Sequence, residues 1–101
     1  MSTRHVLRYL PAAQDDLLAI LDYIAEDSSV RAEEFVADLE DRIGLLEKSP
    51  LLGRIPRNPR LREYGYRVLI VQSHLVFYMI RGNSIERHRV VHGSRNLDQL
   101  I

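Results

Sequence analysis

The stretch between residues 67 and 91 constrains the fold most, because branched and aromatic side chains crowd it. Such side chains suit a pleated, half-buried surface. A Gly82-Asn83 pair interrupts the stretch between two apolar runs. Glycine and asparagine tolerate the backbone angles of a tight hairpin turn. The pattern therefore predicts three short antiparallel strands, at about residues 67–72, 75–81 and 85–91.

Two amphipathic helices are predicted ahead of this stretch. Apolar residues recur there at helical spacing, over residues 12–26 and again over residues 30–48. The short link between the two segments predicts an antiparallel helical hairpin. Ser29 is expected to be the N-cap of the second helix, and Ser49-Pro50 is expected to end it. The hairpin is expected to cover one apolar face of the sheet.

Residues 5–10 predict one further strand ahead of the helices. At 101 residues, with 46% hydrophobic side chains, the chain is long enough for one modest core. We therefore expect a single α+β domain over residues 1–101. Its sheet is expected to be antiparallel with about four strands, covered on one face by the N-terminal helical hairpin, in the order β-α-α-β-β-β.

The composition excludes several classes of site. The chain has no cysteine, so disulfides and thiolate metal sites are ruled out. No apolar run approaches the roughly 20 residues that span a bilayer, and the N-terminus lacks the apolar core of a signal peptide. The four histidines are dispersed, and there is no glycine-rich phosphate loop. We expect a cytoplasmic protein without a membrane segment, metal or cofactor.

The net charge of zero hides a division between the two halves of the chain. Residues 1–50 carry 11 acids and 5 bases, a balance of −6, whereas residues 51–101 carry 3 acids and 9 bases, a balance of +6. Of the 14 basic residues, 13 are arginine, whose planar guanidinium suits carboxylates and phosphates. A GC-rich genome also explains a preference for arginine, but it does not explain the division. The division suggests a basic binding face.

A segment rich in proline and glycine, residues 51–66, is predicted to be an irregular loop because its periodicity fails. It contains one acid, Glu63, and four arginines. The arginines are Arg54, Arg57, Arg60 and Arg62. A loop anchored on a rigid sheet is a common place for binding residues, so we interpret these arginines as binding residues. A solvated loop is the alternative interpretation.

Cleavage of RNA requires a base, an acid and cations that stabilise the phosphate. Candidates for these roles, with Glu63 or Tyr66 nearby, are Arg67, His88, Arg89, His92 and Arg95. Arginine by itself is a poor proton carrier because it stays charged. A solvated sheet face, or ion pairs to the acidic helices, is the structural interpretation of the same residues.

Strict alternation divides the last strand into two faces. One face would carry Ile85, Arg87, Arg89 and Val91. The other face would carry Glu86, His88 and Val90. Each face carries charged side chains, so charged groups are expected at the edge of the core whichever face covers it.

Five segments, taken in order, carry a resemblance to a known family: AAQDDLLAILDYIAED, LEKSPLLGR, LREYGYR, SHLVFYMI and RVVHGSRN. Together with the predicted order of elements, they resemble the RelE/ParE superfamily of bacterial toxins over nearly the whole chain. Members of this superfamily are the toxin halves of type II toxin–antitoxin pairs. RelE-like members cleave mRNA on the ribosome, whereas ParE-like members poison DNA gyrase.

The resemblance is closer to the ParE branch. Two basic positions of the mRNA-cleaving pattern are matched in this chain, by Arg67 and Arg95. Leu69 and Leu75 stand at two of its basic positions, and the chain ends in QLI without the tyrosine of that pattern. A Ser-His pair before the middle strand and a Val-His pair at the end of the last strand resemble ParE-like members.

The resemblance implies a non-enzymatic toxin that arrests growth by poisoning DNA gyrase and belongs to a plasmid stabilization system. A cognate antitoxin would neutralise it in a hetero-oligomer, and direct DNA binding would belong mainly to the antitoxin. The residues expected to bind the antitoxin or the target are Arg54, Arg57, Arg60, Arg62, Arg67 and Arg95. One alternative is a ribosome-dependent mRNA endonuclease that uses Arg67, His88, His92 and Arg95. Another is a non-toxic protein-binding module of the same fold.

Overall fold

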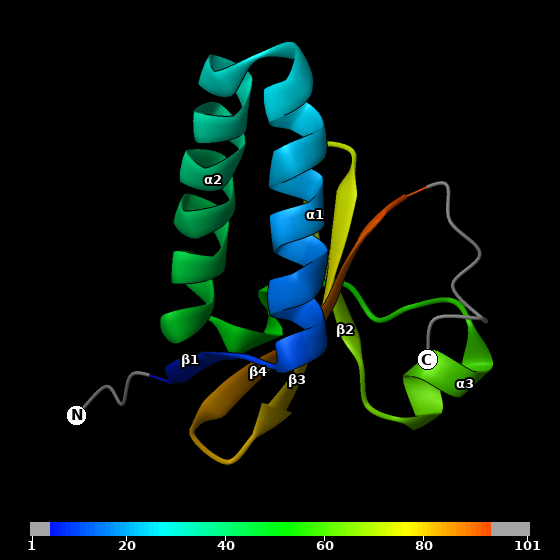
Figure 1. Cartoon of the computed structure of the whole chain (residues 1–101). Coiled ribbons are helices and arrows are strands. Elements are labelled where there is room, and N and C mark those ends of the chain that lie inside the picture. The colour runs from blue at the N-terminus through cyan, green and yellow to red at the C-terminus, as the bar shows by residue number, and fades with distance from the viewer. Residues whose placement is uncertain (1–4, 94–101) are drawn as a thin grey trace.

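In the computed structural model, which describes residues 5–93, a helical hairpin lies across a four-stranded sheet (Figure 1). The hairpin consists of α1 (Pro11–Asp27) and α2 (Ser29–Gly44). The strands are β1 (Val6–Tyr9), β2 (Arg67–Val71), β3 (His74–Arg81) and β4 (Ser84–His92). Between α2 and β2 lie the 3-10 turns η1 (Leu45–Glu47) and η2 (Pro50–Leu52) and the short helix α3 (Pro59–Glu63). The predicted α+β class and the order β-α-α-β-β-β are confirmed, with α3 as an addition.

The sheet has the strand order β1-β4-β3-β2. β2, β3 and β4 are antiparallel neighbours, as predicted, and Gly82 turns the β3–β4 hairpin with a φ of 59°. β1 departs from the expected antiparallel arrangement, because it runs parallel to β4, with Val6 opposite Ser84. The first and last strands are joined only through the rest of the chain, so no hairpin turn forces them to be antiparallel.

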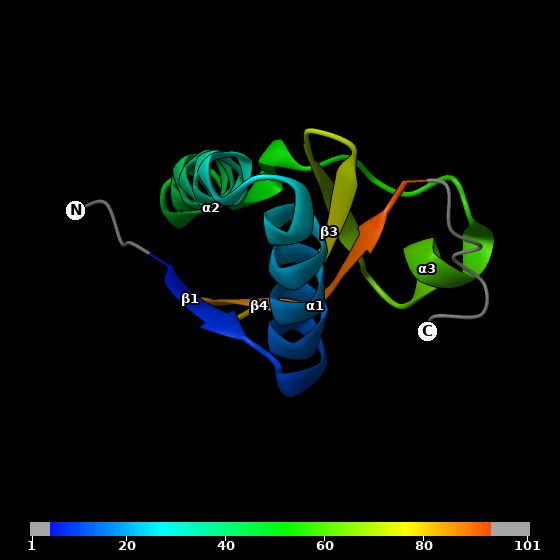
Figure 2. The same cartoon turned by 45° about the horizontal axis from the view of Figure 1, so that its top comes forward.

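The hairpin buries its apolar stripe against one face of the sheet. Phe35, Leu39 and Ile43 of α2 are at most 1% exposed and share a core cluster with Val76 and Tyr78 of β3. Their spacing of four residues places them on one side of the helix. Truncation of one such side chain to alanine costs about 2–5 kcal/mol, so this cluster is a main tie between hairpin and sheet. Figure 2 shows α1 and α2 together over that face, with α3 apart from them.

The ends of α2 differ from the predicted ones. Ser28, rather than Ser29, is the N-cap, because its side-chain oxygen accepts a hydrogen bond from the Arg31 N–H at 3.2 Å. The α-helix ends at Gly44 rather than near residue 48, and η1 continues the chain in a tighter turn. Glycine is a poor helix former, which is consistent with the change of helix type at this residue.

The segment predicted to be an irregular loop, residues 51–66, contains ordered elements. Asn58 begins α3 as its N-cap, because its side-chain oxygen accepts hydrogen bonds from the Arg60 N–H at 2.9 Å and the Leu61 N–H at 3.3 Å. Leu61 is 3% exposed and belongs, with Phe77, to a second apolar cluster. This cluster lies on the face of the sheet that the hairpin leaves open, so both faces carry buried side chains.

A β-bulge interrupts the pairing of β4 with β3. Phe77 of β3 lies opposite Arg89, whereas the next residue, Tyr78, lies opposite Arg87. His88 is therefore an extra residue on β4. Since side chains alternate along a strand, one extra residue exchanges the two faces for every residue beyond it.

The bulge makes the predicted division of the last strand wrong. Ile85 and Val90 both belong to the cluster under the hairpin, and Val91 belongs to the cluster on the second face. Alternation had placed Val91 with Ile85 and Val90 with His88. No glycine marks the bulge in the sequence, so alternation alone could not reveal it.

Gly44 and Gly53 form a matched pair for a stability test. A Cβ added at Gly44 meets no heavy atom within 4 Å, so Gly44→Ala is expected to raise the free energy of unfolding by about 0.5–1 kcal/mol. A Cβ at Gly53 would lie 2.5 Å from the Tyr78 hydroxyl oxygen, so Gly53→Ala is expected to lower it by about 1–3 kcal/mol. Urea unfolding measures both changes, and shifts of the same sign would contradict the packing described.

Candidate functional site

A buried tyrosine and an arginine hold the backbone around η2 against the sheet. Tyr78, fully buried in β3, donates its hydroxyl hydrogen to the Pro50 carbonyl at 2.7 Å and accepts one from the Gly53 N–H at 2.9 Å. Arg67, at the start of β2, donates from Nη1 to the carbonyl oxygens of Gly53 at 2.8 Å and Leu51 at 3.2 Å. We call this set of bonds the Tyr78–Arg67 clasp.

A β-bridge continues the clasp. Arg54 and Val68 each donate a backbone N–H to the other's carbonyl oxygen at 2.8 Å. Burial raises the pKa of the Tyr78 hydroxyl, which keeps it a neutral donor. Arg67 is one of the residues predicted to bind the antitoxin or the target. In the structure its Nη1 bonds to the loop, and its part in binding stays a prediction.

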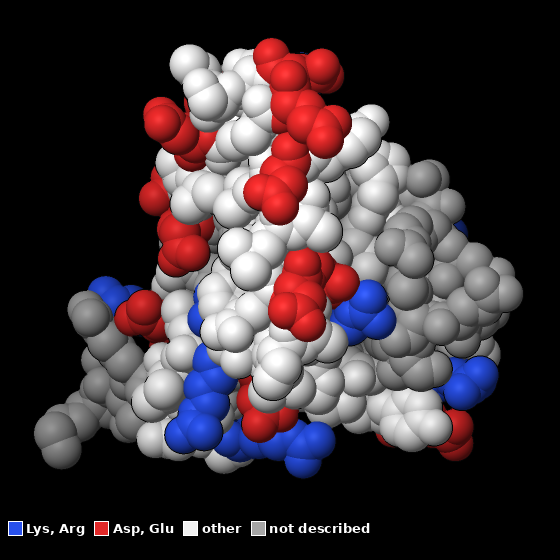
Figure 3. All heavy atoms as spheres, in the orientation of Figure 1, with Lys and Arg blue, Asp and Glu red and all other residues white. Residues whose placement is uncertain are grey.

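The four predicted binding arginines between β2 and η2 are exposed, namely Arg54, Arg57, Arg60 and Arg62. Within residues 5–93, no carboxylate lies at ion-pair distance from any of them. Arg62 makes one bond, from Nη2 to the Arg57 carbonyl at 3.4 Å. Figure 3 shows the opposite charge on the helical hairpin, where Asp and Glu gather along α1 and α2. The division of charge along the sequence is thus also a division in space, and the binding role of the arginines stays a prediction.

A row of polar side chains lies on the second face of the sheet. The Tyr66 hydroxyl oxygen is 3.0 Å from Nδ1 of His88, and Nε2 of His88 is 3.2 Å from Oε1 of Glu86. Arg81 donates from Nε to the same Oε1 at 2.8 Å. A carboxylate only accepts, so in the neutral imidazole Nε2 carries the proton and Nδ1 accepts the Tyr66 hydroxyl hydrogen. We call these four residues the polar row.

The polar row contains the groups of an acid–base site, but they are already bonded to one another. The hydrogen bond from His88 is the largest cause that lowers the pKa of Glu86, and burial raises the pKa of Tyr66. Tyr66 is 8% exposed, and the His88 side chain is 16% exposed. A general base needs a lone pair that a substrate proton can reach. The Nδ1 lone pair of His88 is directed at Tyr66 instead.

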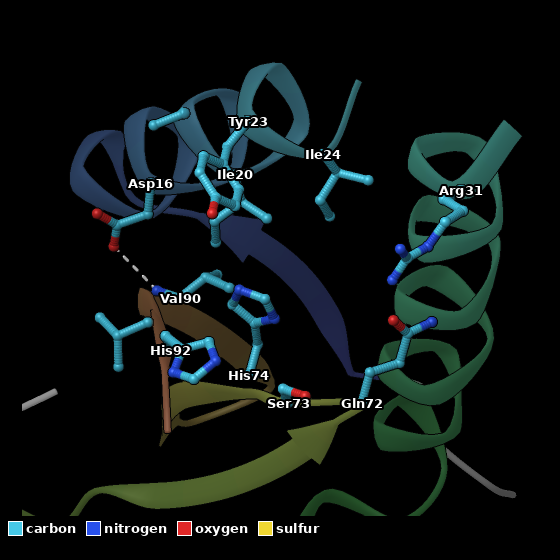
Figure 4. A pocket seen from close by; sticks show the side chains of 12 residues that line it. Asp16, Ile20, Tyr23, Ile24, Arg31, Gln72, Ser73, His74, Val90 and His92 are labelled. Carbon is cyan, nitrogen blue, oxygen red and sulfur yellow. Dashed lines mark hydrogen bonds between the residues drawn. The ribbon is translucent and has the colours of Figure 1, made fainter. Parts of the chain in front are cut away.

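His92 lies on the other side of the sheet, in a groove beneath α1 (Figure 4). It is paired in register with His74 of β3, and the two rings are 5.4 Å apart and nearly perpendicular. The groove has a volume of about 530 Å³. Its α1 wall includes Ile20, Tyr23 and Ile24, and Arg31 and Gln72 stand at its far end. We call it the hairpin groove.

An ion pair closes one end of the hairpin groove. Arg89 donates from Nε and Nη2 to the two carboxylate oxygens of Asp16, at 2.7 and 2.9 Å. Asp16 also accepts the Val90 N–H at 2.9 Å, as Figure 4 shows. The bonds to Asp16 raise the pKa of Arg89 and tie α1 to β4. Arg89, which the sequence makes a candidate for RNA cleavage, is thus part of a contact between α1 and β4.

The structure does not bring together the three predicted nuclease residues that it describes. His88 and His92 face opposite sides of the sheet, and Arg67 bonds to the loop around η2. Arg95 lies outside the described residues. The partner of His88 on the strand is Glu86, two residues away, which strand alternation does predict. Nothing local in the sequence predicts Tyr66 as its second partner.

Two further properties bear on the kind of site. Within residues 5–93, no three His, Asp or Glu side chains converge in a way that would hold a metal ion. None of the described helices is long and apolar enough to cross a membrane.

Comparison with known proteins identifies the family. The profile described as "ParE toxin of type II toxin-antitoxin system, parDE" matches residues 7–97. The chain belongs to the ParE toxin family. Toxin ParE1 of Mycobacterium tuberculosis, from the strains CDC 1551 / Oshkosh and ATCC 25618 / H37Rv, is 34% identical over 101 residues, which cover 98% of each chain. The chain is therefore a type II toxin–antitoxin toxin of the ParE family, as the resemblance implied.

Two solved structures share the ParE fold described above. One is from the chromosomal ParDE system of P. aeruginosa, with a TM-score of 0.71 and 22% identity over 88% of this chain and 96% of that chain. The other is the toxin–antitoxin complex RelBE2 of Mycobacterium tuberculosis, with a TM-score of 0.61 and 19% identity over 91% and 94% of the two chains. At these identities the likeness concerns the fold alone.

His74 of this ParE chain is expected to make stability depend on pH. Burial, with a smaller contribution from His92, lowers its pKa from the usual 6.5, so the folded state resists protonation more than the unfolded state does. Its Nδ1 is buried and has no hydrogen-bond partner among residues 5–93. The free energy of unfolding should therefore fall as the pH drops below about 6.5.

Urea unfolding at pH 7.5 and pH 5.5 measures this effect. The loss between the two values should be smaller in His74→Leu than in the parent chain, because leucine has no proton to take up. An equal loss in both proteins would contradict the burial described for His74.

Proposed function

We propose that this ParE toxin arrests growth in the cytoplasm by binding and poisoning DNA gyrase, and that it does so without catalysing a reaction. The observation that carries the proposal is the state of His88, whose two ring nitrogens lie within hydrogen-bond distance of Tyr66 and Glu86. Of the other predicted nuclease residues, Arg67 and His92 lie in the described part of the chain, the first at the loop around η2 and the second in the hairpin groove. Gyrase is the target that the resemblance implies for ParE-like members, and the similarity to Toxin ParE1 supports that branch.

A cognate antitoxin is the second part of the proposal. The fold neighbours come from a ParDE system and a RelBE2 complex, both of which are toxin–antitoxin pairs. The chain offers such a partner a hairpin groove with an apolar α1 wall and four exposed arginines that have no carboxylate partner among residues 5–93. A tail with apolar and acidic side chains that folds on binding would satisfy both. Direct DNA binding would then belong mainly to the antitoxin.

A gyrase assay tests the proposal. The purified chain, titrated into gyrase holoenzyme with relaxed plasmid and ATP, is expected to inhibit supercoiling and to trap cleaved DNA. Preincubation with the antitoxin should abolish both effects. His88→Gln, which removes the imidazole base, should inhibit gyrase as the parent does, provided that its unfolding midpoint is unchanged.

A ribosome-dependent mRNA endonuclease is the second candidate, because Tyr66, His88 and Glu86 are hydrogen-bonded in series beside Arg81. Growth arrest with normal gyrase activity would contradict the first candidate. Cuts at the ribosomal A site in primer extension, lost in His88→Gln, would establish the second. A chain that leaves growth unaffected without its antitoxin would be a binding module without toxicity.

A further inference from the structure

The loop that the Tyr78–Arg67 clasp holds presents apolar side chains to solvent. Leu51, Leu52 and Ile55 are 66%, 48% and 57% exposed. Single exposed apolar residues are ordinary on a protein surface. Here three of them lie within five residues of one loop, and a cluster of exposed apolar side chains marks an interaction site. We call these three residues the loop patch.

The loop patch is held rigidly, although none of its side chains contributes to either apolar cluster. The carbonyl oxygens of Pro50, Leu51 and Gly53 all accept hydrogen bonds from the clasp. Gly53 lets the buried Tyr78 ring approach the backbone, because a Cβ at this position would collide with it. A surface that is ordered before binding loses less conformational entropy when a partner docks.

Basic side chains border the loop patch. Lys48, Arg54 and Arg57 are exposed, and Glu47 is the only acid between residues 45 and 62. An apolar centre with a charged rim is the usual composition of a protein–protein contact surface. The rim selects an acidic partner, and the leucines select a protein over a nucleic acid, since a phosphate backbone offers them no apolar contact.

We propose that the loop patch is a preformed docking surface for an acidic, amphipathic segment of the protein on which the toxin acts. The proposal deepens the proposed function, and it rests on the chain's having a protein target. The surface is separate from the hairpin groove. The groove is lined by Gln72 and Ser73 at the β2–β3 turn, whereas the clasp is made at Arg67, at the opposite end of β2.

The test replaces the two leucines and measures toxicity. In Leu51→Gln/Leu52→Gln, the concentration that half-inhibits gyrase holoenzyme should rise by at least about tenfold, and growth arrest on expression should be lost. The matched control is Leu18→Gln/Val30→Gln, whose residues are 61% and 60% exposed on the helical hairpin. The control should inhibit gyrase and arrest growth as the parent does. Both variants should keep the parent's unfolding midpoint, because the replaced side chains are exposed.

A second variant tests the clasp without changing the patch. Tyr78→Phe removes the hydroxyl that bonds to Pro50 and Gly53. Amide hydrogen exchange at Gly53 should become faster, and potency should fall between that of the parent and that of the leucine variant. If Tyr78→Phe inhibits gyrase as strongly as the parent although exchange at Gly53 is faster, a rigid loop is not needed for binding the target, and the surface is not a preformed one.

Four outcomes would overturn the inference. The first is a leucine variant as potent as the parent. The second is a labelled RNA or DNA duplex that binds the parent and the leucine variant equally and accounts for toxicity. The third is sedimentation showing that the leucine change only dissociates copies of this chain from one another. The fourth is a parent that neither inhibits gyrase nor arrests growth.

The two proposals fail separately. If the parent arrests growth without inhibiting gyrase, gyrase is the wrong target, and the loop patch is then judged by growth arrest alone. If the parent inhibits gyrase and the leucine variant does so equally, the proposed function stands and the loop patch is refuted.

Discussion

One extra residue in β4 decides how the two faces of the sheet are used. His88 forms a bulge opposite Phe77 and Tyr78, and beyond it the inward and outward positions are exchanged. Because of this exchange, Ile85 and Val90 both pack under the helical hairpin, although four residues separate them and plain alternation would put them on opposite faces. Without the bulge Val90 would leave that cluster, and burying a valine side chain is worth about 1.5–3 kcal/mol.

The same bulge separates the groups that a nuclease would need. Simple alternation places His88 and His92 on one face, four residues apart. In the structure His88 meets Tyr66 and Glu86 on the second face, and His92 meets His74 in the hairpin groove. The arginines named as candidates fall into two groups: some bond to other parts of the chain, and others are exposed. Arg67 bonds to the loop and Arg89 to Asp16, whereas the arginines of residues 54–62 are exposed and suited to binding.

Sequence periodicity predicted the main helices and strands, although it missed the short helix α3 and misplaced both ends of α2. The hairpin helices, the three antiparallel strands and the turn at Gly82 follow from apolar spacing and glycine chemistry. The parallel pairing of β1, the bulge and the clasp depend on residues far apart in the chain. Tyr78 and Gly53, for example, are 25 residues apart, and neither is unusual in its own neighbourhood. For the site, composition located the exposed arginines. It could not show that Arg67 bonds to the loop or that His88 is hydrogen-bonded to Tyr66.

Function by binding rather than catalysis requires that the imidazole of His88 be a fixed part of the sheet. The direct measurement is NMR of its ring nitrogens at neutral pH in the intact chain. A proton fixed on Nε2, with Nδ1 accepting a hydrogen bond that is lost in Tyr66→Phe, is the expected result. A ring that exchanges between tautomers, or that carries its proton on Nδ1, would mean that His88 is available for proton transfer and would contradict this reading of the fold.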